Sequence, residues 1–261
     1  MTLLIGSSAI GGLSVLIVFL LLWGLSLRLS NSSIVDVAWG PGFFFLALVV
    51  WKVSSQPLDI RRGVMLGMVG LWGIRLGAYL AYRNWGRGED RRYLAMRNRH
   101  GERWPLRSLA IVFLLQGFLL WLISWPVQVA VVFGGPKDLG IFDGIGLVLY
   151  VIGFGFEVVA DWQLARFRAR ETDPGALLSS GVWRYSRHPN YFGEALLWWG
   201  IGLMACSVGG VWWCLFGPGV LSFLLLRVSG VPMLEATLSE EKTGYADYVS
   251  RTNAFVPWFP R

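Results

Sequence analysis

Five ionisable side chains lie inside, or at the ends of, long apolar segments of the sequence: Asp36, Arg75, Glu157, Asp161 and Glu194. A charged group within a lipid bilayer is costly, so such residues by default indicate a functional site. Their positions in the apolar segments place all five in the inner half of a membrane. The pattern therefore predicts a polar site, and a set of structural ion pairs, such as Arg75 with Asp36, is the alternative.

Helical spacing groups these residues with others that could take part in binding or proton transfer. Arg75, Tyr79 and Arg83 are spaced four residues apart, so they share one face of a helix. A second group has a similar arrangement if its helix continues past the membrane surface: Glu157, Asp161 and Arg168. Each group combines charged or hydroxyl-bearing side chains on one helix face, as a polar binding site requires.

A third group surrounds an expected helix start at Pro189, because proline is well tolerated at the first helical position. Asn190 and Glu194 then lie one turn apart on that helix. The free backbone N–H groups of the helix start, flanked by Arg184 and Arg187, favour an anionic ligand.

The composition indicates which elements must position these groups. The 261 residues are 55% hydrophobic and 15% charged, whereas soluble domains are about 45–50% apolar and about 25% charged. A membrane span needs about 20 mainly apolar residues. On that basis we expect an all-α, polytopic membrane bundle, organised as a single domain over 1–261, with seven spans near 3–27, 34–53, 63–82, 106–132, 139–160, 191–206 and 210–229. Pro126 is expected to kink or end the fourth span.

The distribution of basic residues predicts the orientation of the spans. Seven spans place 18 of the 23 Lys and Arg residues on one side, including the Arg-rich loops 83–107 and 161–190. The other side receives Lys52, Arg61, Arg62 and Lys137. Cytoplasmic loops carry the positive excess, so the N-terminus should face outward and the C-terminus the cytosol. The membrane would be the cytoplasmic membrane of a bacterium or the endoplasmic reticulum of a eukaryote.

Nucleic acid and metal ions are not expected as ligands. The net charge of +7 arises from short basic blocks between apolar segments, which is typical of topology signals. Cys206 and Cys214 lie in apolar surroundings, and His100 and His188 lie in basic segments. These four residues do not have the spacing of a zinc site or a disulfide framework. The expected partners are the lipid bilayer and a lipophilic small-molecule substrate.

The segment Gly181-Val-Trp-Arg-Tyr-Ser-Arg-His-Pro-Asn-Tyr-Phe-Gly-Glu194 resembles the C-terminal signature of the steroid 5α-reductase family, especially its bacterial branch. Members of this family are integral membrane reductases that use NADPH. The resemblance covers most of the chain and is most specific at Trp72–Tyr93, Asp161–Glu194 and Tyr245–Pro257. No G-x-G-x-x-G motif occurs, so a soluble dinucleotide-binding module is not expected to hold the cofactor.

The resemblance implies roles for individual residues. The cofactor-binding half would cover about 63–261, with NADPH held by Arg75, Arg83, Asp161, Arg168, Tyr185, Arg187, His188, Asn190, Glu194 and Tyr248. Tyr79, supported by Asp36, would donate a proton or hydrogen bond to the substrate carbonyl, and Tyr82 or another group is the alternative donor. The implied reaction is hydride transfer to a carbon–carbon double bond conjugated to that carbonyl in a steroid-like or other lipophilic substrate.

Two other functions stay open at this point. The run Arg187-His-Pro-Asn-Tyr191 is also similar to membrane methyltransferases that modify isoprenylcysteine or phospholipids with S-adenosylmethionine. A non-enzymatic membrane protein is the third reading. The animal reductases carry a Gln-Glu pair on the second span, where this chain has Asp36 without a neighbouring glutamine. The resemblance therefore implies the cofactor more specifically than it implies a steroid.

Overall fold

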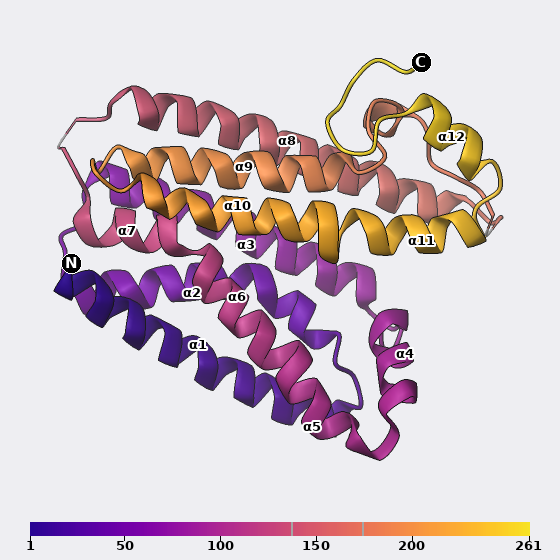
Figure 1. The fold of residues 1–261 in the computed structure, drawn as a ribbon, viewed down its shortest axis with the longest axis horizontal. Coiled ribbons are helices and arrows are strands. Elements are labelled where there is room, and N and C mark those ends of the chain that lie inside the picture. Colours follow the sequence, from indigo (N-terminus) through magenta and orange to yellow (C-terminus); the bar gives the residue numbers. More distant parts are fainter. Residues whose placement is uncertain (137, 174) are drawn as a thin grey trace. The chain divides into compact units, whose positions relative to one another are not determined.

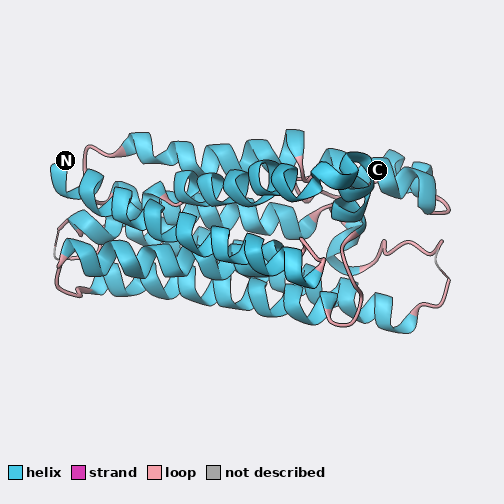
Figure 2. Ribbon diagram, turned by 90° about the horizontal axis from the view of Figure 1, so that it is seen from below, coloured by secondary structure: helices cyan, strands magenta, loops and turns pink. Residues whose placement is uncertain are grey.

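The regular structure of the chain is helical. We describe it from a computed structural model, which covers residues 1–136, 138–173 and 175–261. Within these ranges the chain forms helices and loops and no β-strand (Figure 2). The expected all-α fold is confirmed for the described residues. Lys137, assigned to the outer side from the sequence, lies outside these ranges.

Twelve α-helices are described in these ranges and are labelled in Figure 1 where there is room. They are α1 (Thr2–Leu29), α2 (Ile34–Ser54), α3 (Ile60–Asn84), α4 (Arg91–His100), α5 (Trp104–Ser108), α6 (Leu115–Ile123), α7 (Trp125–Phe133), α8 (Ile141–Arg170), α9 (Pro189–Cys206), α10 (Phe216–Phe223), α11 (Val231–Glu241) and α12 (Tyr245–Arg251). Short 3₁₀ or π segments join several of them, at Gly101–Arg103, Leu109–Leu114, Gly181–Arg184, Trp212–Leu215 and Leu224–Val228.

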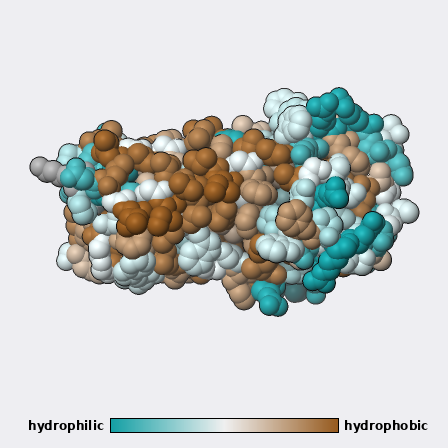
Figure 3. Space-filling model, turned by 90° about the horizontal axis from the view of Figure 1, so that it is seen from above, coloured by the Kyte–Doolittle hydropathy of each residue, from teal (hydrophilic) through white to brown (hydrophobic). Residues whose placement is uncertain are grey.

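Six helical segments of the described chain are long and apolar enough to cross a membrane: α1, α2, α3, Arg91–Ile123, α8 and Trp212–Glu241. They fit a multi-pass membrane protein, as the composition predicts. The expected span 191–206 corresponds to α9, which also contains Asn190 and Glu194 and is not one of the six. On the face drawn in Figure 3, apolar side chains form a broad band and hydrophilic side chains gather toward one end.

The segment 83–107 differs from the expected loop, because most of it is helical. Asp90 accepts a hydrogen bond from the backbone N–H of Arg92 and so caps α4. The helical path then continues through α5 and α6 to Ile123. At Ser124 the helix is interrupted and α7 begins, with Pro126 in its first turn. The break expected near this proline is confirmed.

The described chain divides into two compact units. Unit 1 consists of Met1–Leu139 and Ala205–Cys214, and unit 2 of Gly140–Met204 and Leu215–Arg261. Each unit has its own closely packed helices, described separately below. The expectation of one functional domain over the whole chain stays a prediction.

Unit 1 is built around α2, which packs against α1, α3, α6 and α7. The α2–α3 contact is closest where two glycines face each other. A Cβ atom on Gly73 would lie 2.3 Å from the carbonyl oxygen of Gly40, closer than real Cβ contacts. One turn further along, a Cβ atom on Gly77 would lie 2.6 Å from Cγ of Pro41. Small residues of this kind let the backbones of membrane helices approach closely.

Two arginines at the start of α3 hold the end of α7. Arg62 Nε donates to the carbonyl of Val131 at 2.7 Å, and Arg61 Nη1 donates to the carbonyl of Gly134 at 2.6 Å. Both arginines are almost fully buried. They satisfy carbonyl groups that the end of a helix leaves unpaired. From the sequence these two arginines were expected as loop charges on the outer side. Their burial adds a capping role that composition does not reveal.

Unit 2 is built on an equally close pair, α8 and α9. A Cβ atom on Gly153 would lie 2.5 Å from the backbone nitrogen of Leu197 and 2.6 Å from the carbonyl oxygen of Gly193. Two turns away, a Cβ atom on Gly146 would lie 2.6 Å from the carbonyl oxygen of Gly200. The other side of α9 contacts α10, where Trp199 Nε1 donates to Ser222 Oγ at 3.0 Å.

Candidate functional site

Each unit carries a polar cluster that includes residues singled out from the sequence. In unit 1, the Asp36 cluster consists of Asp36, Arg92, Tyr93 and Gln116. The carboxylate of Asp36 accepts hydrogen bonds from Tyr93 Oη at 2.7 Å and from Arg92 Nη2 at 2.9 Å. Gln116 Nε2 donates to Tyr93 Oη at 3.0 Å. The Tyr93 side chain is buried, so its hydroxyl is held by two partners away from bulk solvent.

The turn between α1 and α2 fixes the position of this cluster. Ser33 Oγ accepts a hydrogen bond from the backbone N–H of Asp90 at 2.7 Å. The carboxylate of Glu89 accepts one from the backbone N–H of Ser32 at 2.6 Å and is paired with Arg97 at 2.7 Å. These bonds tie the start of α2 to the start of α4, and so bring Asp36 and Tyr93 together.

The electrostatics of Glu89 match this structural role. Partial burial acts to raise the pKa of Glu89, but the hydrogen bonds from Arg97 and Ser32 outweigh it and hold the pKa below its ordinary value. Glu89 is therefore ionised at neutral pH and keeps both partners. The paired charges belong to the scaffold of the Asp36 cluster.

The third-span group lies on α3 with the spacing predicted from the sequence. The guanidinium carbon of Arg75 lies 5.6 Å from the ring centroid of Tyr79, in a cation–π arrangement. Arg83 Nε donates to Asn84 Oδ1 at 3.2 Å. Arg75, Tyr79 and Arg83 are all partly exposed. The shared helix face is confirmed, and the binding and catalytic roles of its residues stay predictions.

Sequence reasoning did not identify the partners of Asp36. It paired Asp36 with Arg75 or Tyr79, whereas the structure gives it Arg92 and Tyr93. These residues lie at the end of Trp72–Tyr93, one of the three segments in which the resemblance is most specific. The missing information was the fold of segment 83–107. As a loop it would place Tyr93 in solvent, and as a capped helix it brings Tyr93 to α2.

In unit 2, the Asp161 cluster consists of Glu157, Asp161, Asn190 and Glu194. Glu157 and Asp161 follow one another by one turn on α8 and are only 3% and 5% exposed. Asn190 lies in the first turn of α9, and its Nδ2 donates to Asp161 Oδ1 at 3.4 Å. Glu194 lies one turn further along α9 and is half-buried. The close α8–α9 contact at Gly153 and Gly193 brings these polar side chains to one place.

The helix α8 continues to Arg170, as the predicted Glu157–Asp161–Arg168 face requires. Arg168 is exposed on its last turns. The segment after α8 returns to pack on it, since the backbone N–H of Val182 donates to Gln163 Oε1 at 3.0 Å and Trp183 Nε1 donates to the carbonyl of Ala160 at 3.2 Å. This return places Pro189 at the start of α9, as predicted.

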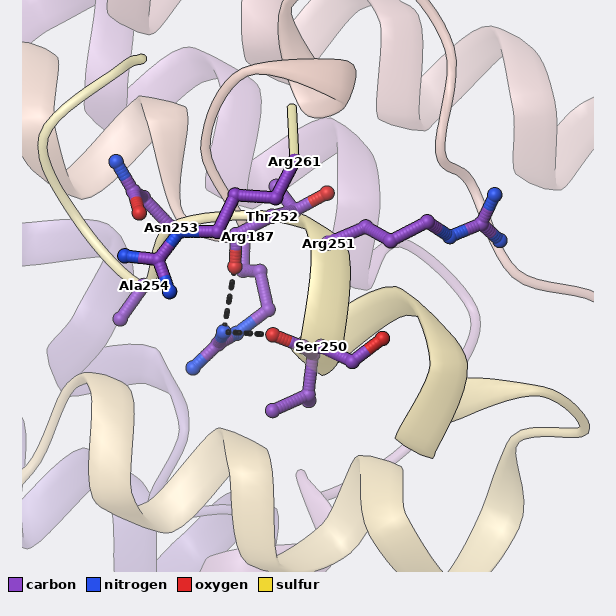
Figure 4. A pocket seen from close by; sticks show the side chains of 8 residues that line it. Arg187, Ser250, Arg251, Thr252, Asn253, Ala254 and Arg261 are labelled. Carbon is purple, nitrogen blue, oxygen red and sulfur yellow. Dashed lines mark hydrogen bonds between the residues drawn. The ribbon is translucent and has the colours of Figure 1, made fainter. Parts of the chain in front are cut away.

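Two of the predicted cofactor residues, Arg187 and His188, attach the C-terminal segment to unit 2. Arg187 Nε donates to Glu235 Oε1 at 2.8 Å. Its Nη1 donates to the carbonyls of Thr252 at 2.7 Å and Val249 at 3.3 Å, as drawn in Figure 4. His188 Nε2 lies 3.2 Å from the same Glu235 oxygen. A cavity of about 200 Å³ lies beside Arg187 and the 249–254 segment.

Tyr248 and Tyr185 take part in the same attachment. Tyr248 Oη donates to the carbonyls of Trp183 and Ser186, and the backbone N–H of Trp258 donates to the carbonyl of Tyr185 at 2.9 Å. The four residues Tyr185, Arg187, His188 and Tyr248 thus have structural partners within unit 2. Their role in cofactor binding stays a prediction. In the same unit, Asp161 and Asn190 are also predicted cofactor residues, and they contact each other directly.

His188 should make the stability of unit 2 depend on pH. Burial lowers the pKa of His188 below its ordinary value, against the opposing effect of the Glu235 carboxylate. The pKa of His188 is therefore lower in the folded protein than in the unfolded protein, where it is about 6.5. Its contribution to stability is fully present above pH 6.5 and is lost as the pH falls through the pKa of the folded state. We expect the thermal midpoint in detergent to drop between pH 7 and pH 5, and to drop less in His188→Gln. Parallel curves for the two proteins would contradict this assignment.

Comparison with known proteins gives a family and a relative. The family model described as "Protein of unknown function (DUF1295)" matches residues 22–252. An uncharacterized protein of Schizosaccharomyces pombe is 32% identical over 202 residues, which are 68% of this chain. The match covers 58% of the length of that yeast protein. No solved structure matches the chain.

Proposed function

The chain belongs to the DUF1295 family, and from this premise we propose that it is a membrane-embedded, NADPH-dependent reductase of lipophilic enones. The single observation that carries the proposal is the Asp161 cluster. The carboxylates of Glu157 and Asp161 are buried, and Asp161 accepts a hydrogen bond from the Asn190 amide. Buried charges between apolar helices are costly to maintain without a function. Three members of the cluster, Asp161, Asn190 and Glu194, are residues that the resemblance to the steroid 5α-reductase family assigns to the cofactor.

The residues present fit this cofactor by their chemistry. Carboxylate oxygens of Asp161 and Glu194 suit ribose hydroxyl groups, and the Asn190 side chain offers both a donor and an acceptor for a carboxamide. Arg168, exposed on the same helix as Asp161, can pair with a phosphate. Arg75 and Arg83 are further cationic groups that the resemblance assigns to the cofactor. When bound, NADPH supplies the hydride that reduces the double bond.

The Asp36 cluster supports a proton-donating role toward the substrate. Tyr93 carries a hydroxyl held between Asp36 and Gln116. When this O–H turns from the Asp36 carboxylate to a substrate carbonyl, it can give the carbonyl its one proton while Gln116 still donates to the phenol oxygen. Such a proton transfer typically contributes 10²–10⁴-fold to a rate. We propose Tyr93, positioned by Asp36, as a proton donor alongside the earlier candidate Tyr79.

Variants of Asn190, in the Asp161 cluster, and of Arg168, on the same helix as Asp161, test the cofactor assignment. Asn190→Ala and Arg168→Ala should each weaken NADPH binding, with Arg168→Ala losing charge-assisted bonds of about 1.5–3 kcal/mol, or roughly 10- to 150-fold in Kd. Binding is measured by calorimetry on detergent-purified protein. Arg99→Ala, which removes an exposed arginine of α4, is the charge-matched control and should bind as the parent does. Parental affinity in both Asn190→Ala and Arg168→Ala would reject the assignment.

The proposed topology has seven spans with the N-terminus outside and the C-terminus in the cytosol. The 18-to-4 division of basic residues supports it. In unit 1, hydrogen bonds join residues 32–33 to residues 89–90, so the turn between α1 and α2 and the start of α4 lie at the same end of that unit. Single cysteines at Arg99 and Leu58, both exposed, should be labelled by a membrane-impermeant reagent from opposite sides. Labelling of both from one side would refute this topology.

A further inference from the structure

One face of α8 carries an exposed stripe that the proposed reductase does not use. Exposed apolar side chains follow each other at helical spacing along it: Ile145, Val148, Ile152 and Val159. The same spacing continues with Trp162, Arg166 and Arg170, which are also exposed. The stripe therefore changes from aliphatic to aromatic to basic along a single helix face.

The length of α8 explains where this change occurs. Its 30 residues extend about 45 Å at about 1.5 Å per residue, whereas the hydrocarbon core of a bilayer is about 30 Å thick. About ten residues at one end must therefore lie in the headgroup region or beyond. Trp162 follows the last exposed aliphatic residue, Val159, at the boundary where tryptophans gather in membrane proteins.

A groove of about 380 Å³ opens beside this end of the stripe. It is lined by Trp162, Gln163, Arg166, Phe167, Arg170 and the backbone at Gly181, among others. The guanidinium of Arg166 lies over the Trp162 ring at 5.3 Å. The carboxylate of Glu171 also lines the groove, but one of its oxygens accepts backbone N–H bonds from Thr172 and Asp173, both at 3.0 Å.

We propose that this groove binds the phosphate headgroup of an anionic phospholipid. The acyl chains would lie along the aliphatic part of the stripe, and the indole of Trp162 would lie at the level of the glycerol. Arg166 and Arg170 would pair with the phosphate oxygens, as basic pockets at the cytoplasmic face do with anionic lipids. The site is separate from the Asp161 cluster, because Asp161 is buried on another face of α8.

Native mass spectrometry of the detergent-purified full chain can measure this binding. Phosphatidylglycerol should bind more tightly than phosphatidylcholine of the same acyl chains. The double variant Arg166→Gln/Arg170→Gln should lower the affinity for phosphatidylglycerol by about 30-fold, because each arginine contributes about 1 kcal/mol. Arg99→Gln/Arg103→Gln, an equal loss of exposed charge on unit 1, should leave it within about twofold of the parent.

A second variant and a competition separate the lipid from simpler explanations. Trp162→Leu keeps both arginines and should lower the affinity for phosphatidylglycerol. The melting curve of this variant should match that of the parent protein. Inorganic phosphate at millimolar concentration should not displace the lipid, because it lacks the acyl chains. The proposal fails if the two double variants lose phosphatidylglycerol equally, if phosphatidylcholine binds as tightly, or if phosphate alone displaces the lipid.

Discussion

Replacing Gly153 with alanine should destabilise the protein by about 3 kcal/mol, at the upper end of typical overpacking costs. The new Cβ atom would lie 2.5 Å from the backbone nitrogen of Leu197 and 2.6 Å from the carbonyl oxygen of Gly193. Both are backbone atoms, so a side-chain rotation cannot relieve the contact. The helices α8 and α9 would have to separate, and the Asp161–Asn190 hydrogen bond between them would be lost.

Gly155 on the same helix provides the matched control. A Cβ atom there would meet no atom within 4 Å, and alanine is favoured over glycine in a helix by about 0.5–1 kcal/mol. Gly155→Ala should therefore melt at or above the parental temperature, and Gly153→Ala well below it. Thermal unfolding in detergent, followed by circular dichroism, checks both. Similar melting temperatures for the two variants would contradict the close α8–α9 packing.

The second large effect concerns the proposed chemical step. Tyr93→Phe removes the hydroxyl held by Asp36 and Gln116, and should lower turnover of an enone by 10²–10⁴-fold if this hydroxyl gives the proton. Asp36→Asn removes the charge that positions Tyr93 and should also lower turnover. NADPH affinity should stay parental in both, because neither residue belongs to the Asp161 cluster.

Two tyrosines on α3 serve as comparisons. Tyr82→Phe alters a side chain that is 76% exposed and should keep full activity. Tyr79→Phe decides between Tyr79 and Tyr93 as the proton donor, since only the donor's variant should lose turnover while still binding NADPH. Full activity in Tyr93→Phe would exclude Tyr93 as the donor. Aggregation of Asp36→Asn on extraction would instead indicate that Asp36 has a structural role with Arg92.

The sequence predicted the helical membrane fold because its signal is local. Apolar runs, the start of α9 at Pro189 and the break near Pro126 each depend on residues close together in the chain. The continuation of α8 to Arg170 was also a matter of local helix geometry. These features follow from rules that act within one helix.

The contacts that build the clusters depend on residues far apart, and the sequence did not reveal them. The Tyr93–Asp36 bond joins positions 57 residues apart, and it needs segment 83–107 to be helical. The sequence predicts Arg61 and Arg62 as loop charges, whereas in the structure they bind carbonyl groups at the end of α7, about 70 residues away in the chain. From the sequence, the basic residues of these two regions indicated only which side of the membrane they face. In the structure, Arg61, Arg62 and Arg92 also have hydrogen-bond partners within unit 1.

The central claim is that the Asp161 cluster serves a nicotinamide cofactor, and titration calorimetry of the purified full chain tests it most directly. NADPH and S-adenosylmethionine are titrated in parallel into the same preparation. The account predicts saturable binding of NADPH that is weaker in Asn190→Ala, and no binding of S-adenosylmethionine. Binding of S-adenosylmethionine alone would contradict the reductase and favour the methyltransferase related by the Arg187–Tyr191 run.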